Sequence, residues 1–162
     1  MKTLLILRHA KSSWKETGVT DHDRSLNKRG RRDAPRIGDL LREEGLVPDM
    51  ILGSSAKRAK RTAEIVAEES GFGGDIMFSR ELYAAWPESY IDVLNIQPDH
   101  YDCVMVVGHN PGLEELLLTL TGEAERMPTA ALAQVTLPID SWRELSYETS
   151  GALVKIWRPR EL

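Results

Sequence analysis

Short apolar runs alternate along this chain with longer stretches in which apolar residues recur every three or four positions. The apolar runs predict buried strands at 3–7, 50–53, 76–78 and 102–107. The stretches with helical spacing predict helices at 28–44, 56–70, 87–96 and 113–121. Two later runs, 133–139 and 152–157, alternate in part between apolar and polar positions, which is typical of an edge hairpin.

Residues at the ends of the helical stretches support these boundaries. Asn27 is placed to cap the helix at 28–44, and Gly45 follows as its stop. The serines at 54–55 are placed to cap the next helix, because Ser is a favoured N-cap residue. Pro35 lies inside the first helical stretch, so the pattern predicts either a later helix start or a kink there.

The regular alternation of strands and helices predicts the fold class. It favours an α/β protein, a three-layer sandwich in which a mostly parallel central sheet carries helices on both faces. The chain has 162 residues and shows no internal repeat, low-complexity tract or linker. We therefore expect a single domain spanning 1–162.

The composition excludes several classes of protein. With 41% hydrophobic and 28% charged residues, the chain can bury a core and is not of the disordered type. The one cysteine, Cys103, excludes an internal disulfide framework and fits a buried small hydrophobe. The apolar start at 3–7 is too short for a secretory signal, and no stretch approaches the ~18 apolar residues of a membrane helix. We expect a cytoplasmic protein.

Charge is distributed unevenly between the two parts of the chain. Residues 1–61 hold 15 Lys/Arg and 8 Asp/Glu, whereas residues 62–162 hold 6 and 17, for a net charge of −4. A basic half is typical of a nucleic-acid face, an anion site or a solvated helix surface. The overall acidity, with only two Phe to stack on bases, disfavours nucleic acid as a partner and favours a local anion site.

Polar residues of the types that act in catalysis and ligand binding follow three of the predicted strands. Arg8 and His9 follow the first strand, 54–58 follow the second, and 108–110 follow the strand at 102–107. Because ligands of open α/β sheets bind beyond the carboxyl ends of the parallel strands, these segments should meet at one edge. The sequence therefore predicts that two histidines, His9 and His109, converge there with two arginines, Arg8 and Arg58.

This combination of side chains fits a phosphoryl group. Guanidinium forks match phosphate oxygens bidentately, which suits Arg8 and Arg58. A neutral imidazole is a competent nucleophile at phosphorus, which suits His9, and His109 can donate to a phosphoryl oxygen as charge builds up. Taken singly, each histidine would more often be structural, and Arg58 would more often be solvated helix surface. Their occurrence together at one edge of the sheet favours a catalytic role over a structural one.

Four segments, in this order along the chain, resemble the histidine phosphatase superfamily, which includes the phosphoglycerate mutases. Arg8-His9-Ala10 resembles its Arg-His-Gly signature, and 21–30 resembles the segment that leads into its first helix. The segment 54–63 is similar to that of its second arginine, and 107–110 to its second-histidine turn. The small size and the start at 8–14 look most like the SixA-type phosphohistidine phosphatases. The resemblance runs from about residue 3 to 122.

The resemblance implies a phosphoglycerate mutase-like fold and a role for each matching residue. His9 would be transiently phosphorylated, and Arg8, Arg58 and His109 would complete the phosphate pocket. Asn110 would be a neighbouring substrate-binding residue. No metal ion and no organic cofactor would be required. Ala10 stands where many members have Gly, so a positive φ there would be strained.

A departure from the family concerns the general acid. Members that act on alcohol esters usually carry a Glu where this chain has Ala84, and the nearby Glu81 and Glu88 either substitute for it or are surface charges. An alkoxide needs a proton to leave, whereas a phosphorylated imidazole can leave as a neutral ring. The loss favours phosphorus–nitrogen over phosphorus–oxygen substrates. The segment 70–100 is also too short for a large lid.

We therefore expect a metal-independent phosphohydrolase that removes phosphate from phosphohistidine on a signalling protein, such as a phosphotransfer domain. The alternatives are a phosphatase of small phosphate monoesters and, from another class, a non-catalytic module that binds a phosphorylated residue. Basic residues at 11–31 are placed to steer an acidic partner, although they also fit a solvated helix start. We expect a monomer with no membrane or nucleic-acid partner. His22 lacks spaced metal-ligand partners, and His100 lies at the opposite end of its strand.

Overall fold

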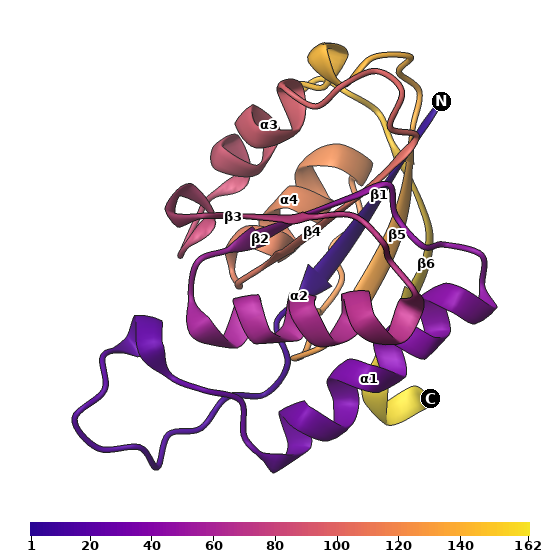
Figure 1. The fold of residues 1–162 in the computed structure, drawn as a ribbon. Helices are drawn as coiled ribbons and strands as arrows, with labels where there is room; N and C mark the ends of the chain where they lie inside the picture. The colour runs from indigo at the N-terminus through magenta and orange to yellow at the C-terminus, as the bar shows by residue number, and fades with distance from the viewer.

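Six strands form one central sheet in the computed structural model, which describes residues 1–162 (Figure 1). In chain order they are β1 Lys2–Arg8, β2 Met50–Ser54, β3 Ile76–Ser79, β4 Cys103–Gly108, β5 Leu132–Leu137 and β6 Ala152–Trp157. Their order across the sheet is β3-β2-β4-β1-β5-β6. The first four strands of that order are parallel, and β5 runs antiparallel to both β1 and β6. The prediction of a mostly parallel sheet is confirmed.

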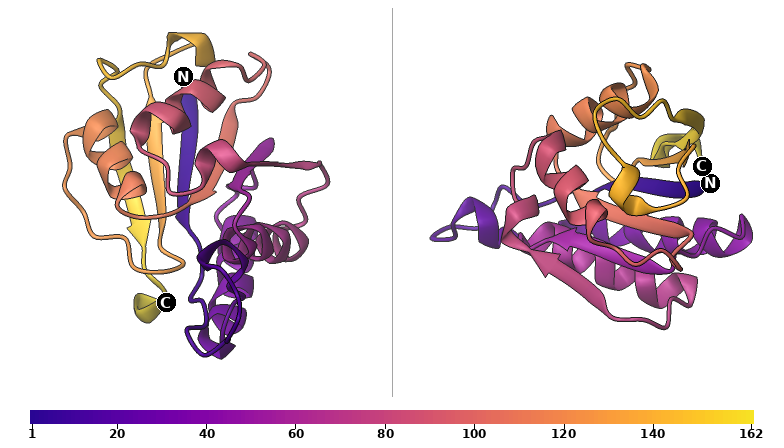
Figure 2. Two further views of the ribbon diagram at one scale, coloured as in Figure 1. Left: turned by 90° about the vertical axis from the view of Figure 1, so that its left-hand side faces the viewer. Right: turned by 90° about the horizontal axis from the view of Figure 1, so that it is seen from above.

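Helices cover both faces of the sheet, as the sequence predicts (Figures 1 and 2). The helices are α1 Lys28–Glu43, α2 Lys57–Ser70, α3 Pro87–Asn95 and α4 Gly112–Thr121. The pair α1 and α2 packs on one face, and the pair α3 and α4 packs on the other. No helix of this protein combines the length and the apolar character needed to cross a membrane.

Continuous apolar runs form β1, β2 and β4 because these central strands are buried on both sides. In β1, Leu4 and Ile6 point into the core beneath α3 and α4, whereas Leu5 and Leu7 point into the core beneath α1 and α2. All four side chains are fully buried. Full burial of a leucine or isoleucine contributes roughly 1.5–3 kcal/mol, so β1 and β4 fix the centre of the molecule.

Helix ends follow local sequence signals in some places but not in others. The Asn27 side chain accepts a hydrogen bond from the Gly30 N–H at 2.9 Å, so the predicted N-cap of α1 is confirmed. Helix α1 runs from Lys28 with Pro35 inside it, so a later start is wrong. Neither serine at 54–55 caps α2, because its N-cap residue is Ala56 and no side chain bonds there.

The last two strands differ from a simple hairpin. Strand β5 lies between β1 and β6, so of these last two strands only β6 is an edge strand. The connection at 138–151 is long and contains the short 3-10 helix Trp142–Glu144. Trp142 is fully buried, and its indole N–H donates to the Tyr101 carbonyl at 2.8 Å. This connection therefore completes the core beneath α3 rather than forming a tight turn.

Strand register brings the polar segments to one level at the carboxyl edge of the sheet. Arg8 of β1 pairs with Gly108 of β4, and Gly53 of β2 pairs with Val107 of β4. The next residues along the three strands are therefore neighbours. The loop between β1 and α1 projects from this edge, and it includes the 3-10 helix Asp21–Asp23 (Figure 1).

Replacing Gly112 by alanine should destabilise the fold at this edge. A Cβ at Gly112 would lie 1.9 Å from the Ala85 carbonyl oxygen, and this backbone has little room to move. We expect a loss of about 1–3 kcal/mol in the free energy of unfolding, measured by urea denaturation. Gly73→Ala is the matched control, since a Cβ there would meet nothing within 4 Å. Equal stability of the two variants would contradict the packing at α4.

Candidate active site

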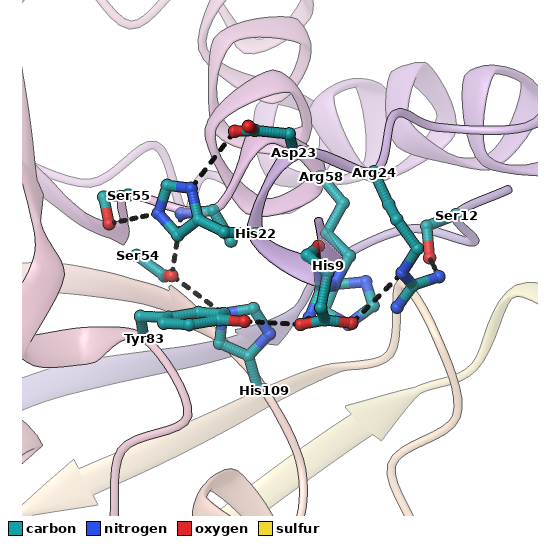
Figure 3. Close-up of polar contacts among 12 residues, drawn as sticks. His9, Ser12, His22, Asp23, Arg24, Ser54, Ser55, Arg58, Tyr83 and His109 are labelled. Atoms are coloured by element: carbon teal, nitrogen blue, oxygen red, sulfur yellow. Dashed lines mark hydrogen bonds and ion pairs between the residues drawn. The ribbon is translucent and has the colours of Figure 1, made fainter. Parts of the chain in front are cut away.

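Two histidines from neighbouring strands face each other at the carboxyl edge of the sheet. His9 follows β1 and His109 follows β4, and their ring centroids lie 5.1 Å apart with the planes tilted by 53° (Figure 3). The exposed fractions of the two residues are 6% and 5%. The predicted convergence of the two imidazoles is thus present in the structure.

The surroundings of His9 leave its Nε2 atom as a free base. Its Nδ1 atom lies 2.8 Å from the carbonyl oxygen of Ala10, which can only accept, so Nδ1 carries the hydrogen. Burial, together with the nearby His109, Arg58 and Arg8, lowers the pKa of His9 to about 3. The ring is therefore neutral at physiological pH, with the Nε2 lone pair available.

His109 is held in place from both its backbone and its ring. Its Nε2 atom lies 2.7 Å from the Ser54 hydroxyl, and its backbone N–H donates to the Tyr90 hydroxyl at 3.3 Å. Burial lowers the pKa of His109 to about 4, with Arg58 as the next largest cause. This ring is therefore also neutral at physiological pH.

The two arginines each leave a buried donor unused. Arg58 donates through Nη1 to the Asp21 carbonyl at 2.7 Å and through Nη2 to the Asp21 carboxylate at 3.1 Å. Arg8 donates through Nη1 to the Met127 carbonyl at 3.2 Å. The Nε atoms of Arg8 and Arg58 are the only buried side-chain nitrogen or oxygen atoms of the protein that lack a hydrogen-bond partner. Because such groups are almost always satisfied, this pair indicates a site for an anion.

Asp21 connects Arg58 to the rest of the site, a role that the sequence did not suggest. One carboxylate oxygen accepts from the Tyr83 hydroxyl at 2.5 Å and from Arg58, and the other accepts from Arg24 Nε at 3.1 Å. The Tyr83 hydrogen bond, followed by those from the arginines, lowers the pKa of Asp21 to about 2. Asp21 is therefore an ionised partner that orients Arg58 at neutral pH.

Arg24 anchors the loop that carries Asp21. It donates to the Ser12 hydroxyl at 2.6 Å (Figure 3). Its guanidinium lies 3.6 Å from the centroid of the Trp14 ring. Arg24 is 9% exposed, so it is not one of the free basic groups expected to steer a partner. Its part is to fix the loop above the site.

The Asn110 side chain is engaged within the protein. Its amide nitrogen donates to the Glu114 carboxylate at 2.9 Å and to the Met127 carbonyl at 2.8 Å. Its amide oxygen accepts from the Glu114 backbone N–H at 3.2 Å. These bonds connect the start of α4 to Met127, whose carbonyl oxygen also accepts from Arg8. Asn110 therefore has a structural role next to the site.

No glutamate enters the site from the segment where the family carries its acid. Ala84 occupies that place with a left-handed φ of 51°, and Glu81 and Glu88 are both exposed. The carboxylate whose charge acts on His109 is that of Asp21. Ala10 has no positive φ, so the replacement of glycine there causes no backbone strain.

The remaining histidines have other surroundings. His22 lies 2.8 Å from the Ser55 hydroxyl and 3.3 Å from the Asp23 carboxylate, and its ring meets Tyr83 edge-on. His100 is exposed and packs against Tyr101. The structure contains no cluster of three or more His, Cys, Asp or Glu side chains suited to a metal ion.

Three residues of the site were missed as site residues by sequence reasoning. They are Asp21, Ser54 and Tyr83. Ser54 is the last residue of β2 and lies just before α2, a position at which serine more often caps a helix. Asp21 stands three residues before Arg24 in a segment that resembles the family, and this spacing was the available signal. Nothing local distinguishes Tyr83.

Comparison with known proteins assigns the family. The model of the histidine phosphatase superfamily (branch 1) matches residues 4–82. The crystal structure of a SixA protein from Agrobacterium tumefaciens is 31% identical and superposes with a TM-score of 0.83 over 98% of both chains. This chain belongs to the histidine phosphatase superfamily, and its fold is that of the SixA proteins.

Other relatives place the chain within that superfamily. An uncharacterized chloroplast protein of Arabidopsis thaliana is 31% identical over 160 residues, covering 93% of this chain and 72% of that protein. A SixA complexed with tungstate, described as a protein histidine phosphatase, has a TM-score of 0.83 at 21% identity and 98% coverage of both chains. A 2,3-bisphosphoglycerate-dependent phosphoglycerate mutase of Thermobifida fusca is 44% identical over 73 residues, covering 44% of this chain and 30% of the mutase. Together the family and the SixA-like fold support a phosphatase enzyme.

The two buried neutral histidines should make the stability of the protein depend on pH. An unfolded histidine binds a proton near pH 6.5, whereas folded His9 and His109 bind one only at about 3 and about 4. The unfolded chain therefore takes up protons first as the pH falls. The free energy of unfolding should decrease between pH 7 and 5, by up to about 2 kcal/mol per histidine.

Urea denaturation at several pH values measures this decrease. His9→Gln should show a smaller decrease than the unchanged protein, because one of the two depressed groups is gone. His100→Gln, at an exposed position, is the matched control and should retain the full decrease. A His9→Gln variant with the same pH dependence as the unchanged protein would contradict the buried neutral ring.

Proposed function

We propose that this protein is a phosphohydrolase in which His9 accepts the phosphoryl group and water then releases it. The observation that carries the proposal is the pair of unpartnered arginine Nε–H donors beside two buried neutral imidazoles. Phosphoryl transfer without a metal ion needs a nucleophile and positive charge around the phosphoryl oxygens. His9 fits the first role, and the two guanidinium groups with the second imidazole fit the other.

The reaction proceeds in two displacements. In the first, His9 Nε2 attacks phosphorus, a nitrogen–phosphorus bond to His9 forms, and the bond to the leaving group breaks. Arg8, Arg58 and His109 hold the other phosphoryl oxygens. In the second, water attacks phosphorus, the bond to His9 breaks, and one water proton passes to the site or to solvent while phosphate leaves. The arriving dianion raises the pKa of His109, which can then donate to a phosphoryl oxygen.

The lack of a protonated carboxyl group in the site favours phosphohistidine as the substrate. Glu81 and Glu88 are both exposed, Ala84 lies between them, and the pKa of Asp21 is lowered to about 2, so no carboxyl group holds a proton for a leaving group at neutral pH. An alkoxide leaving group needs such a proton, whereas a protonated phosphoimidazole leaves as a neutral ring. Transfer of a phosphoryl group from one imidazole to another also breaks one phosphorus–nitrogen bond and forms another of the same kind.

A basic groove beside the site fits a protein substrate. The groove has a volume of about 600 Å³ and is lined by 11–16, 25–29 and Arg31. Lys11, Lys15 and Lys28 contribute positive charge to it, against the single carboxylate of Glu16. These charges support a proposal that an acidic phosphotransfer protein docks here and presents its phosphohistidine to His9.

A phosphatase of small phosphate monoesters is the alternative within the same chemistry. The mutase relatives are named for a small phosphate compound, and they match 44% and 41% of this chain. A non-catalytic module that binds a phosphorylated residue is a further alternative. Binding alone would need only the two arginines, so this alternative gives no reason for a buried neutral imidazole at His9.

His9→Ala should abolish turnover while the protein stays folded. Loss of the nucleophile should reduce kcat by about a thousand-fold or more. After brief exposure to labelled substrate, the unchanged protein should carry an acid-labile phosphoryl group and the variant should carry none. His100→Ala is the control, and circular dichroism checks the fold. Turnover by His9→Ala at the normal rate would refute the assignment, and a labelled variant would place the phosphoryl group elsewhere.

The leaving group should decide the rate. With a chelator present throughout, kcat/KM should rank a phosphohistidine protein first, an aryl phosphate second and an alkyl phosphate last. Because a positioned acid contributes roughly 10²–10⁴-fold, we expect at least about a hundred-fold between the first and the last. Equal rates on the three substrates would favour the monoester alternative and would leave the role of His9 unchanged. Inhibition by the chelator would contradict metal independence.

A further inference from the structure

A second groove, of about 620 Å³, lies beside the first turns of α1 and carries an unusual excess of arginine. Arg29, Arg32 and Arg36 line it from α1, and Arg160 lines it from the short 3-10 helix Pro159–Glu161, which packs against α1. The three α1 residues follow one another at helical spacing on a single face. The only carboxylate side chain in the lining is that of Asp33.

The charges of this groove are only partly compensated. Asp33 is buried, and one of its oxygens accepts from Arg32 Nε at 3.1 Å and from Arg36 Nη1 at 3.2 Å. Arg29 makes one hydrogen bond, to the Thr129 hydroxyl at 3.2 Å. Arg160 makes no ion pair and no side-chain hydrogen bond within the protein. Most N–H donors of Arg29, Arg32 and Arg160 therefore stay free.

Arg36 differs from the other three arginines because its role is structural. Besides Asp33, it donates through Nη2 to the carbonyl oxygen of Pro159 and to a main-chain oxygen of Leu162, the last residue of the sequence, both at 3.1 Å. It thereby fastens the C-terminal turn onto α1 and shapes one wall of the groove. Like charges at this spacing destabilise a helix by a few tenths of a kcal/mol, so helix stability does not explain Arg29, which makes no ion pair, whereas Arg32 compensates the buried Asp33.

We propose that this groove binds a compact polyanion, of the class of linear polyphosphates. Free guanidinium forks on two walls match clustered phosphoryl oxygens bidentately. The lining contains arginines, a threonine and prolines but no aromatic ring, so it offers no platform for a nucleobase. The volume is in the range of small-molecule sites.

The groove is separate from the candidate active site but shares a backbone segment with it. None of Arg8, His9, Arg58 or His109 lines the groove. Thr129 does, and the next residue, Ala130, donates its N–H to the carbonyl oxygens of Arg8 and His9 at 3.2 and 3.0 Å. The polyanion site therefore does not depend on the proposed phosphatase activity.

Titration of the full-length protein with inorganic tripolyphosphate tests the site. By calorimetry at physiological ionic strength we expect saturable one-to-one binding that is at least about ten-fold tighter than that of orthophosphate. The double variant Arg32→Ala/Arg160→Ala should weaken it about ten-fold or more, since two exposed forks are lost. The matched double variant Arg61→Ala/Arg143→Ala removes the same charge from exposed positions outside the groove and should bind normally.

Amide chemical shifts locate the bound anion. The largest changes should fall at 29–36, 128–129 and 159–160. Largest changes around His9 and His109 would show that tripolyphosphate occupies the candidate active site and would overturn the proposal. Equal weakening in both double variants would show attraction by net charge alone, and absence of binding would overturn it as well.

Discussion

The buried guanidinium of Arg58 is the constraint on which the whole site depends. Its charge lowers the pKa of Arg8, His9, His109 and Asp21. Burial is the largest cause that lowers the pKa of the two imidazoles, and the Arg58 charge adds to it. For the Asp21 carboxylate, the Tyr83 hydrogen bond is the largest cause, and Arg58 adds to that effect as well. A buried cation is costly without an anion. Asp21 supplies such an anion within the protein, and the buried Nε of Arg58 still lacks a hydrogen-bond partner.

Asp21 also explains why a loop belongs to the site. Both contacts of Arg58 within the protein go to Asp21, one to its backbone and one to its carboxylate. The guanidinium plane is therefore set by the loop, which Arg24 and Trp14 hold in turn. The strands determine where Arg58 and the histidines lie, whereas the loop determines which edge of the guanidinium faces the anion. Positioning of this kind is where phosphoryl-transfer sites obtain most of their rate.

Sequence reasoning succeeded where one local rule decides the outcome. Runs apolar on both faces predicted β1 and β4, and the strand-end rule brought His9 and His109 together. It failed where one residue has two competing uses: Ser54 is a good capping residue by type but bonds to His109 instead. Tyr83 reaches Asp21 across 62 positions of sequence, a contact that only the packed fold can define.

Ala130 shows how the backbone completes the arrangement. Its left-handed φ of 62° costs a residue with a Cβ roughly 1–2 kcal/mol. In that conformation its single N–H reaches the carbonyls of both Arg8 and His9, while Met127 of the same segment accepts from the Arg8 side chain. The strained residue thus fixes the nucleophile and one cation together. Thr129, the residue before it, lines the arginine groove, so the groove and the candidate active site share this backbone segment.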